Sequence, residues 1–146
     1  MKWIAAVPQL LALGVLLALA SAASAATVKK PFTGTWSGKT TQDISFVDPD
    51  AEPFSVRITI TALEGHLQSL ATTVRMECPG PAVQDIRILK SFGSRGPLLT
   101  KGGGFAIRVS GVSISGGLAP AGGSGRFDVA KGGCHGKGTF KLKRVL

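Results

Sequence analysis

The sequence has 146 residues, with 17 Lys and Arg against 8 Asp and Glu, two histidines, two cysteines and no tyrosine. Its length suits one domain with a core of its own. With only two histidines, few side chains titrate near neutral pH, which argues against acid–base catalysis. The formal net charge of +9 favours anionic over cationic partners.

Residues 1–25 form a predicted export signal. They carry one positive charge, an uninterrupted apolar core from Leu10 to Ala20 and the small-x-small cleavage pattern ASA at 23–25. The core is shorter than the roughly 20 residues that span a bilayer, so retention as an anchor is the less favoured alternative. No cysteine lies near the cleavage point, which excludes a lipoprotein anchor. We therefore expect residues 26–146 to form a single exported domain, periplasmic or extracellular, with no membrane span.

Alternation of apolar and polar residues with a period of two runs through the remaining chain. It is clear at 54–61 (FSVRITIT) and returns at 70–78, 105–110, 126–129 and 134–143. Such alternation turns one face of a strand toward a core and the other toward water, and no segment has helical spacing. Turns rich in Gly and Pro separate the strands. The pattern predicts an all-β fold, an antiparallel sandwich or barrel of short strands.

The two cysteines are predicted to face the same interior. Within 134–143 the even positions, including Cys134, point inward and the odd positions point to solvent, while Cys78 shares the inward face of its strand with Val74 and Met76. Because export leads to an oxidising compartment, we predict a buried disulfide between Cys78 and Cys134. His135 points away from Cys134, so the pair is a poor metal site, and we expect no metal or cofactor.

Basic residues concentrate in the second half of the chain. Residues 26–86 hold five basic and seven acidic side chains, whereas residues 87–146 hold eleven basic and one acidic. Either the lysines of the terminal strand hinder edge-to-edge aggregation, or they form a stripe for polyanions such as lipopolysaccharide. Because the aromatic residues fall on the core face, we expect no specific nucleic-acid binding. The candidate anion-binding residues are Lys137, Lys141, Lys143, Arg108 and Arg126.

Candidate catalytic residues are sparse, and we predict that the protein is not an enzyme. His66 follows a Glu-Gly turn and is predicted to be solvated, and no nucleophile elbow, HExxH or phosphate-binding loop occurs. The segment 48–52 (DPDAE) lacks the glycine and ligand spacing of a calcium loop and reads as a solvated turn. The alternative is a small hydrolase acting on cell-wall sugars. It requires His66 to share a concave pocket with the acidic residues Asp43, Asp48, Asp50 and Glu52.

Several short glycine-based motifs follow one another along the chain. They are WSGKTTQ at 36–42, Cys78, GF at 104–105, GRF at 125–127 and GCHG at 133–136. In these motifs the chain resembles a loosely defined group of small secreted bacterial β-proteins with a G-x-T-x-Q opening strand, a G-x-F strand pair and a closing G-C-x-G strand. The resemblance implies bacterial export, a disulfide-bridged β domain and no known catalytic residues. The ending KLKRVL departs from the aromatic finish of that group.

Three functions are compatible with these features. We favour a non-enzymatic exported β domain that binds an anionic envelope component or a partner protein through a basic face, and the hydrolase is the second reading. The third is a small-ligand carrier, which requires a hollow interior. Trp36 would then line a ligand pocket, but on an opening strand it is predicted to be a core residue.

Overall fold

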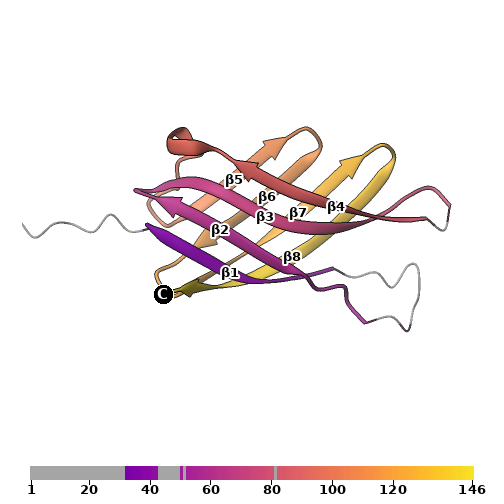
Figure 1. Cartoon of the computed structure of the whole chain (residues 1–146), viewed down its shortest axis with the longest axis horizontal. Helices are drawn as coiled ribbons and strands as arrows, with labels where there is room; N and C mark the ends of the chain where they lie inside the picture. The colour runs from indigo at the N-terminus through magenta and orange to yellow at the C-terminus, as the bar shows by residue number, and fades with distance from the viewer. Residues whose placement is uncertain (1–31, 43–49, 51, 81) are drawn as a thin grey trace, which may run out of the picture.

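The computed structural model describes residues 32–42, 50, 52–80 and 82–146, so the predicted export signal lies outside the described residues. Eight strands and one short 3-10 helix make up this part, and the strand pairs are antiparallel (Figure 1), which confirms the predicted fold class. Within these ranges no helix has the length and apolar character needed to cross a membrane. The elements are β1 (Gly34–Thr41), β2 (Arg57–Leu63), β3 (His66–Glu77), β4 (Val83–Ser91), η1 (Gly93–Arg95), β5 (Gly104–Val109), β6 (Val112–Leu118), β7 (Gly122–Lys131) and β8 (Cys134–Val145).

The strands form one continuous sheet in the order β4-β3-β2-β1-β8-β7-β6-β5. Each half is a meander of four consecutive strands, and pairing of β1 with β8 joins the two halves. Figure 1 shows the sheet curled on itself, with β3 and β4 crossing in front of the strands of the other half. The two edges, β4 and β5, both contribute to the lining of a slot of 180 Å³. The architecture is therefore one curled, up-and-down antiparallel sheet whose two edge strands are β4 and β5.

The interior is filled by the apolar side chains that alternation directs inward. Trp36 is 0 % exposed, and its indole Nε1 donates a hydrogen bond of 2.9 Å to the carbonyl oxygen of Ala119, which satisfies the polar end of the ring. Trp36 is thus a core residue, as predicted. A packed interior counts against the carrier alternative. The cluster comprises Trp36, Ile58, Ile60, Ala62, Leu67, Leu70, Val74, Met76, Ile88, Leu99, Phe105, Ile107, Ile114, Leu118, Phe127, Val129, Cys134, Phe140 and Leu142.

Strand ends depart from the predicted alternation. Val109 is 39 % exposed because it is the last residue of an edge strand, next to a turn in which Ser110 and Gly111 have φ values of 46° and 78°. Phe54 and Val56 are only half-buried, since β2 begins after them, at Arg57. Periodicity therefore identifies the facing of central strand residues but not the point at which a strand leaves the sheet.

Reciprocal glycine–phenylalanine pairs join β7 and β8. In the register of these strands Gly125 lies opposite Phe140, and Phe127 lies opposite Gly138. A Cβ atom added to Gly125 would lie 2.8 Å from Cε1 of Phe140, and one added to Gly138 would lie 2.7 Å from Cζ of Phe127. Each ring thus covers the glycine of the other strand, an arrangement that restores apolar contact where a strand lacks a side chain.

Alanine at Gly125 is expected to lower the free energy of unfolding by about 1–3 kcal/mol, because Phe140 and the backbone of Ser115 must both move to make room. Gly117→Ala is the matched control. Its Cβ would meet no atom within 4 Å, so we expect a change within about 0.5 kcal/mol. Urea denaturation followed by tryptophan fluorescence measures both variants. Equal stability of the two would contradict the packing argument.

Candidate anion-binding face

The five predicted anion-binding residues lie on one face of the sheet. Arg108 is on β5, Arg126 on β7, and the three lysines are on β8, and all five are exposed. Their register places them on alternate positions opposite the core residues, so they share the outer face of the β5–β8 half. The structure therefore brings these residues to a common surface.

The position of β8 in the sheet distinguishes the two roles predicted for its lysines, protection of a sheet edge and binding of polyanions. Although β8 is the last strand in the sequence, it lies between β1 and β7 near the middle of the sheet, and the edges are β4 and β5. Lysines protect a sheet against edge-to-edge pairing only when they lie on an edge strand. The expectation that the lysines guard an edge is therefore wrong, because a strand at the chain terminus need not be at the sheet edge.

Two further basic residues, which sequence reasoning missed, extend the face. Lys39 of β1 lies directly opposite Arg57 of β2 on one side and Lys141 of β8 on the other. Side chains directly opposite one another on antiparallel strands have Cβ atoms about 5 Å apart, so these three cations form one short row across the sheet. We call Arg57, Lys39 and Lys141 the cation row. Alternation alone predicts that each points outward, but the row exists only through the pairing of β1 with both neighbours.

Among the described residues, the cation row has no carboxylate paired with it. No ion pair links its three members to an acidic side chain of the described chain, and Lys143 follows Lys141 on the same face. Like charges directly opposite on neighbouring strands destabilise a sheet. At the other end of the face the charge is more balanced, since Asp128 lies directly opposite Lys137. Positive charge is thus most concentrated around Lys39 and Lys141.

A separate ion pair, between Arg75 on β3 and Asp85 on β4, stabilises the fold. Both guanidinium nitrogens Nε and Nη2 of Arg75 donate bonds of 2.8 Å to the carboxylate of Asp85, and the guanidinium carbon lies 3.8 Å from the ring centroid of Phe54. Hydrogen bonding to Arg75 lowers the pKa of Asp85 and raises that of Arg75, so the pair is fully charged at neutral pH. Through Phe54, Arg75 holds the chain just before β2 against β3. Because its guanidinium is already paired with Asp85, we do not count Arg75 among the anion-binding residues.

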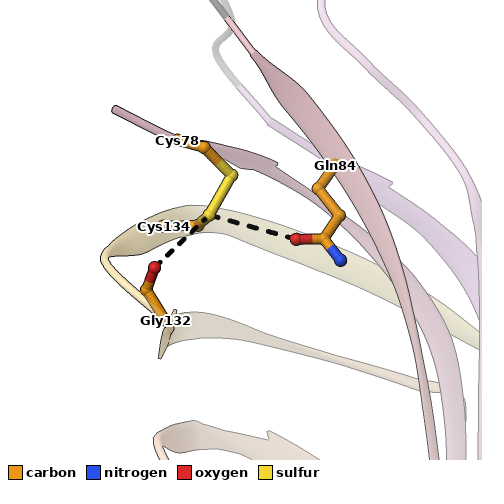
Figure 2. Close-up of a disulfide and its surroundings, with 4 residues drawn as sticks. All are labelled: Cys78, Gln84, Gly132 and Cys134. Atoms are coloured by element: carbon orange, nitrogen blue, oxygen red, sulfur yellow. Dashed lines mark hydrogen bonds between the residues drawn. A yellow bond between two sulfur atoms is a disulfide. The ribbon is translucent and has the colours of Figure 1, made fainter. Parts of the chain in front are cut away.

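The predicted disulfide between Cys78 and Cys134 is confirmed. It links the residue after the end of β3 to the first residue of β8 (Figure 2). The neighbouring residues Glu77 and His135 lie opposite one another in the strand register. Cys134 is 6 % exposed, whereas Cys78 is half-buried because it lies beyond the last residue of β3. The sulfur of Cys134 lies 4.0 Å from Oε1 of Gln84; since a bridged sulfur carries no hydrogen, this is a packing contact.

The opening motif (36–42) and the closing motif (133–136) meet at this same junction of β1, β3 and β8. Gln42 is 1 % exposed, and its side-chain amide pairs with the backbone of Arg75 as a strand residue would: Nε2 donates to the carbonyl (2.8 Å) and Oε1 accepts from the amide (2.9 Å). Thr40 Oγ1 accepts from the amide of Val56 at 3.2 Å. A side chain on Gly136 would place its Cβ 2.6 Å from the carbonyl oxygen of Arg75. The opening and closing motifs therefore build the junction itself.

The residues required by the hydrolase alternative do not converge within the described chain. Glu52 precedes β2 and His66 follows it, and the seven residues of β2 span about 20 Å. His66 is half-buried rather than solvated, because its Nδ1 lies 2.9 Å from the carbonyl oxygen of Gly96. Asp43 and Asp48 lie outside the described residues. No group of three or more metal-ligating side chains occurs in the described ranges.

Comparison of the chain with protein-family models, with curated proteins and with solved structures found no match. By its fold, the protein belongs to the all-β class: it is a curled antiparallel sheet with one disulfide and a basic outer face. The resemblance to small secreted bacterial β-proteins stays a prediction.

Proposed function

We propose that the protein is an exported, non-enzymatic β domain that binds an anionic component of the cell envelope through the outer face of β1, β2 and β5–β8. The observation that carries the proposal is the cation row in the middle of the sheet. Three cations stand directly opposite one another with no carboxylate from the described chain beside them, at a cost in stability that an anionic ligand would remove.

Topology strengthens this reading over a purely protective role. Since β8 is a central strand, its lysines are not needed to block strand pairing, and solubility alone does not require cations in register on three adjacent strands. The disulfide is compatible with an oxidising compartment outside the cytoplasm, where envelope polyanions occur.

Binding to immobilised heparin tests the proposal. We expect retention at low ionic strength that falls at physiological salt, because exposed charges are screened within about 8 Å at 0.15 M. The double variant Lys39→Gln/Lys141→Gln should bind about five- to tenfold more weakly, since each exposed ion pair contributes up to about 1 kcal/mol.

A control that removes the same charge elsewhere separates site binding from net charge. Arg95 lies on η1 and Arg87 on edge strand β4; both are exposed and neither is on the cation row. The double variant Arg87→Gln/Arg95→Gln should retain wild-type affinity within about twofold. Equal weakening of both double variants, or retention of the wild type that is insensitive to salt, would refute a localised anion site.

A further inference from the structure

Two adjoining grooves cross the outer face of the β5–β8 half. The larger has a volume of 880 Å³ and reaches Lys141, and the smaller has a volume of 530 Å³ and reaches Lys137. They share Ala106, Ser115, Arg126 and Thr139 in their linings, so they form one continuous depression. We call this depression the outer trough.

Charged side chains and hydroxyl groups alternate across the trough. Arg126 lies between Ser115 on β6 and Thr139 on β8, each directly opposite it. In the neighbouring row Asp128 lies between Ser113 and Lys137. This composition differs from the cation row, where only cations stand side by side. A ligand that offers hydroxyl groups as well as negative charges complements this lining.

Polymers of phosphate match this lining poorly. A phosphate chain presents only anionic oxygens, which accept hydrogen bonds from the serine and threonine hydroxyls but are repelled by Asp128 and offer its carboxylate no donor. Single-stranded nucleic acid needs exposed rings for its bases, and the exposed large hydrophobic residues of the described chain include no aromatic side chain. A sugar hydroxyl can donate to Asp128 and exchange hydrogen bonds with serine and threonine, while a sugar carboxylate suits Arg126.

The shape of the trough favours a chain over a compact ligand. Small-molecule sites bury most of their ligand in a cleft, whereas this depression runs over the face of four strands and is floored by the small side chains of Ala106 and Ser115. From the row of Lys137 to that of Lys141 the distance along β8 is four residues, about 13 Å, which exceeds a single sugar ring.

We propose that the outer trough binds a strand of an acidic polysaccharide, with sugar carboxylates at Arg126 and the flanking lysines and sugar hydroxyls at Ser115, Thr139 and Asp128. The inference rests on the proposed function and names its ligand class. Because the exposed large hydrophobic residues of the described chain include no aromatic ring to stack on a sugar, the binding depends on charge and hydrogen bonds and weakens with salt.

Filling the trough without changing any charge tests this proposal. Ala106→Phe places a ring on the exposed floor of the trough, and Ala130→Phe places the same ring at an exposed position of β7 that lines neither groove. The probes are polygalacturonate, the same polymer with its carboxylates reduced to alcohols, and inorganic polyphosphate. Binding is measured by isothermal titration calorimetry at low salt.

We expect Ala106→Phe to weaken polygalacturonate binding at least about tenfold and polyphosphate binding less than about twofold, with Ala130→Phe unchanged for both. Arg126→Gln, which adds no bulk, should likewise weaken polygalacturonate binding more than polyphosphate binding. The polymer with reduced carboxylates should bind the wild type far more weakly than polygalacturonate does. Polygalacturonate binding that survives Ala106→Phe, or equal loss of both anions, overturns the trough as a glycan site. Binding of polyphosphate alone by the wild type refutes the glycan but leaves the proposed function intact, and binding of neither anion refutes both.

Discussion

Loss of the disulfide is expected to lower the free energy of unfolding by about 4 kcal/mol, the value that the chain-entropy relation gives for a bridge across 56 residues. The double variant Cys78→Ala/Cys134→Ala removes the bond without leaving a buried thiol. The bond also lies beside Glu77 and His135, where β3 pairs with β8, so its loss frees the end of the sheet as well as the unfolded chain.

Guanidinium chloride denaturation of the oxidised wild type, the reduced wild type and the double variant measures this effect. The last two should agree to within about 1 kcal/mol, because both lack the cross-link and they differ only in the two sulfur atoms. A difference below about 1 kcal/mol between the oxidised and reduced proteins would show that packing at the junction, and not the covalent bond, holds β3 against β8.

The second large effect is expected at Gln42. Gln42→Leu keeps the volume of the side chain but removes both hydrogen bonds to the backbone of Arg75, which leaves a part-buried amide and carbonyl without these partners. Each unsatisfied group costs about 1–3 kcal/mol, so we expect the free energy of unfolding to fall by about 3 kcal/mol.

Gln84→Leu is the matched control for Gln42→Leu. Gln84 is exposed on β4, and its amide makes only the 4.0 Å contact to Cys134, so the change in stability should stay within about 0.5 kcal/mol. Amide hydrogen exchange adds a local measurement: in Gln42→Leu the amide of Arg75 should exchange faster relative to those of the strand centre. Unchanged protection at Arg75 would show that another group replaces the glutamine.

The junction gives a physical account of the motifs that the sequence displays. Gln42 and Gly136 are needed because β3 passes from β2 to β8 at this point: Gln42 satisfies the backbone of Arg75, and Gly136 lets that backbone approach closely. Thr40 holds the backbone of Val56, just before β2. The Gly-x-Phe segments act on the opposite side of β8, where each ring covers a glycine of the facing strand. These motifs stabilise the fold. The proposed anion-binding residues Lys39 and Lys141 lie instead on the outer face.

Chain-local patterns were sufficient to predict the fold class, the facing of most strand residues, the core position of Trp36 and the disulfide. The reason is that alternation is a property of each strand alone: whichever strand lies beside it, every second side chain points inward, so Cys134 and Phe140 face the core in any pairing. Half-buried His66 escaped this reasoning, because its partner, the carbonyl of Gly96, comes from a segment thirty residues away.

Strand order and register were decided only by the tertiary structure. The same alternating sequence would be satisfied if β8 were an edge strand, and its lysines would then have a protective role; placement between β1 and β7 instead sets Lys141 beside Lys39 and Arg57. The position of β8 in the strand order depends on how the apolar faces of the strands pack together and on the closure of long loops. Neither is encoded in a local pattern. The cation row and the outer trough are therefore products of the assembled sheet.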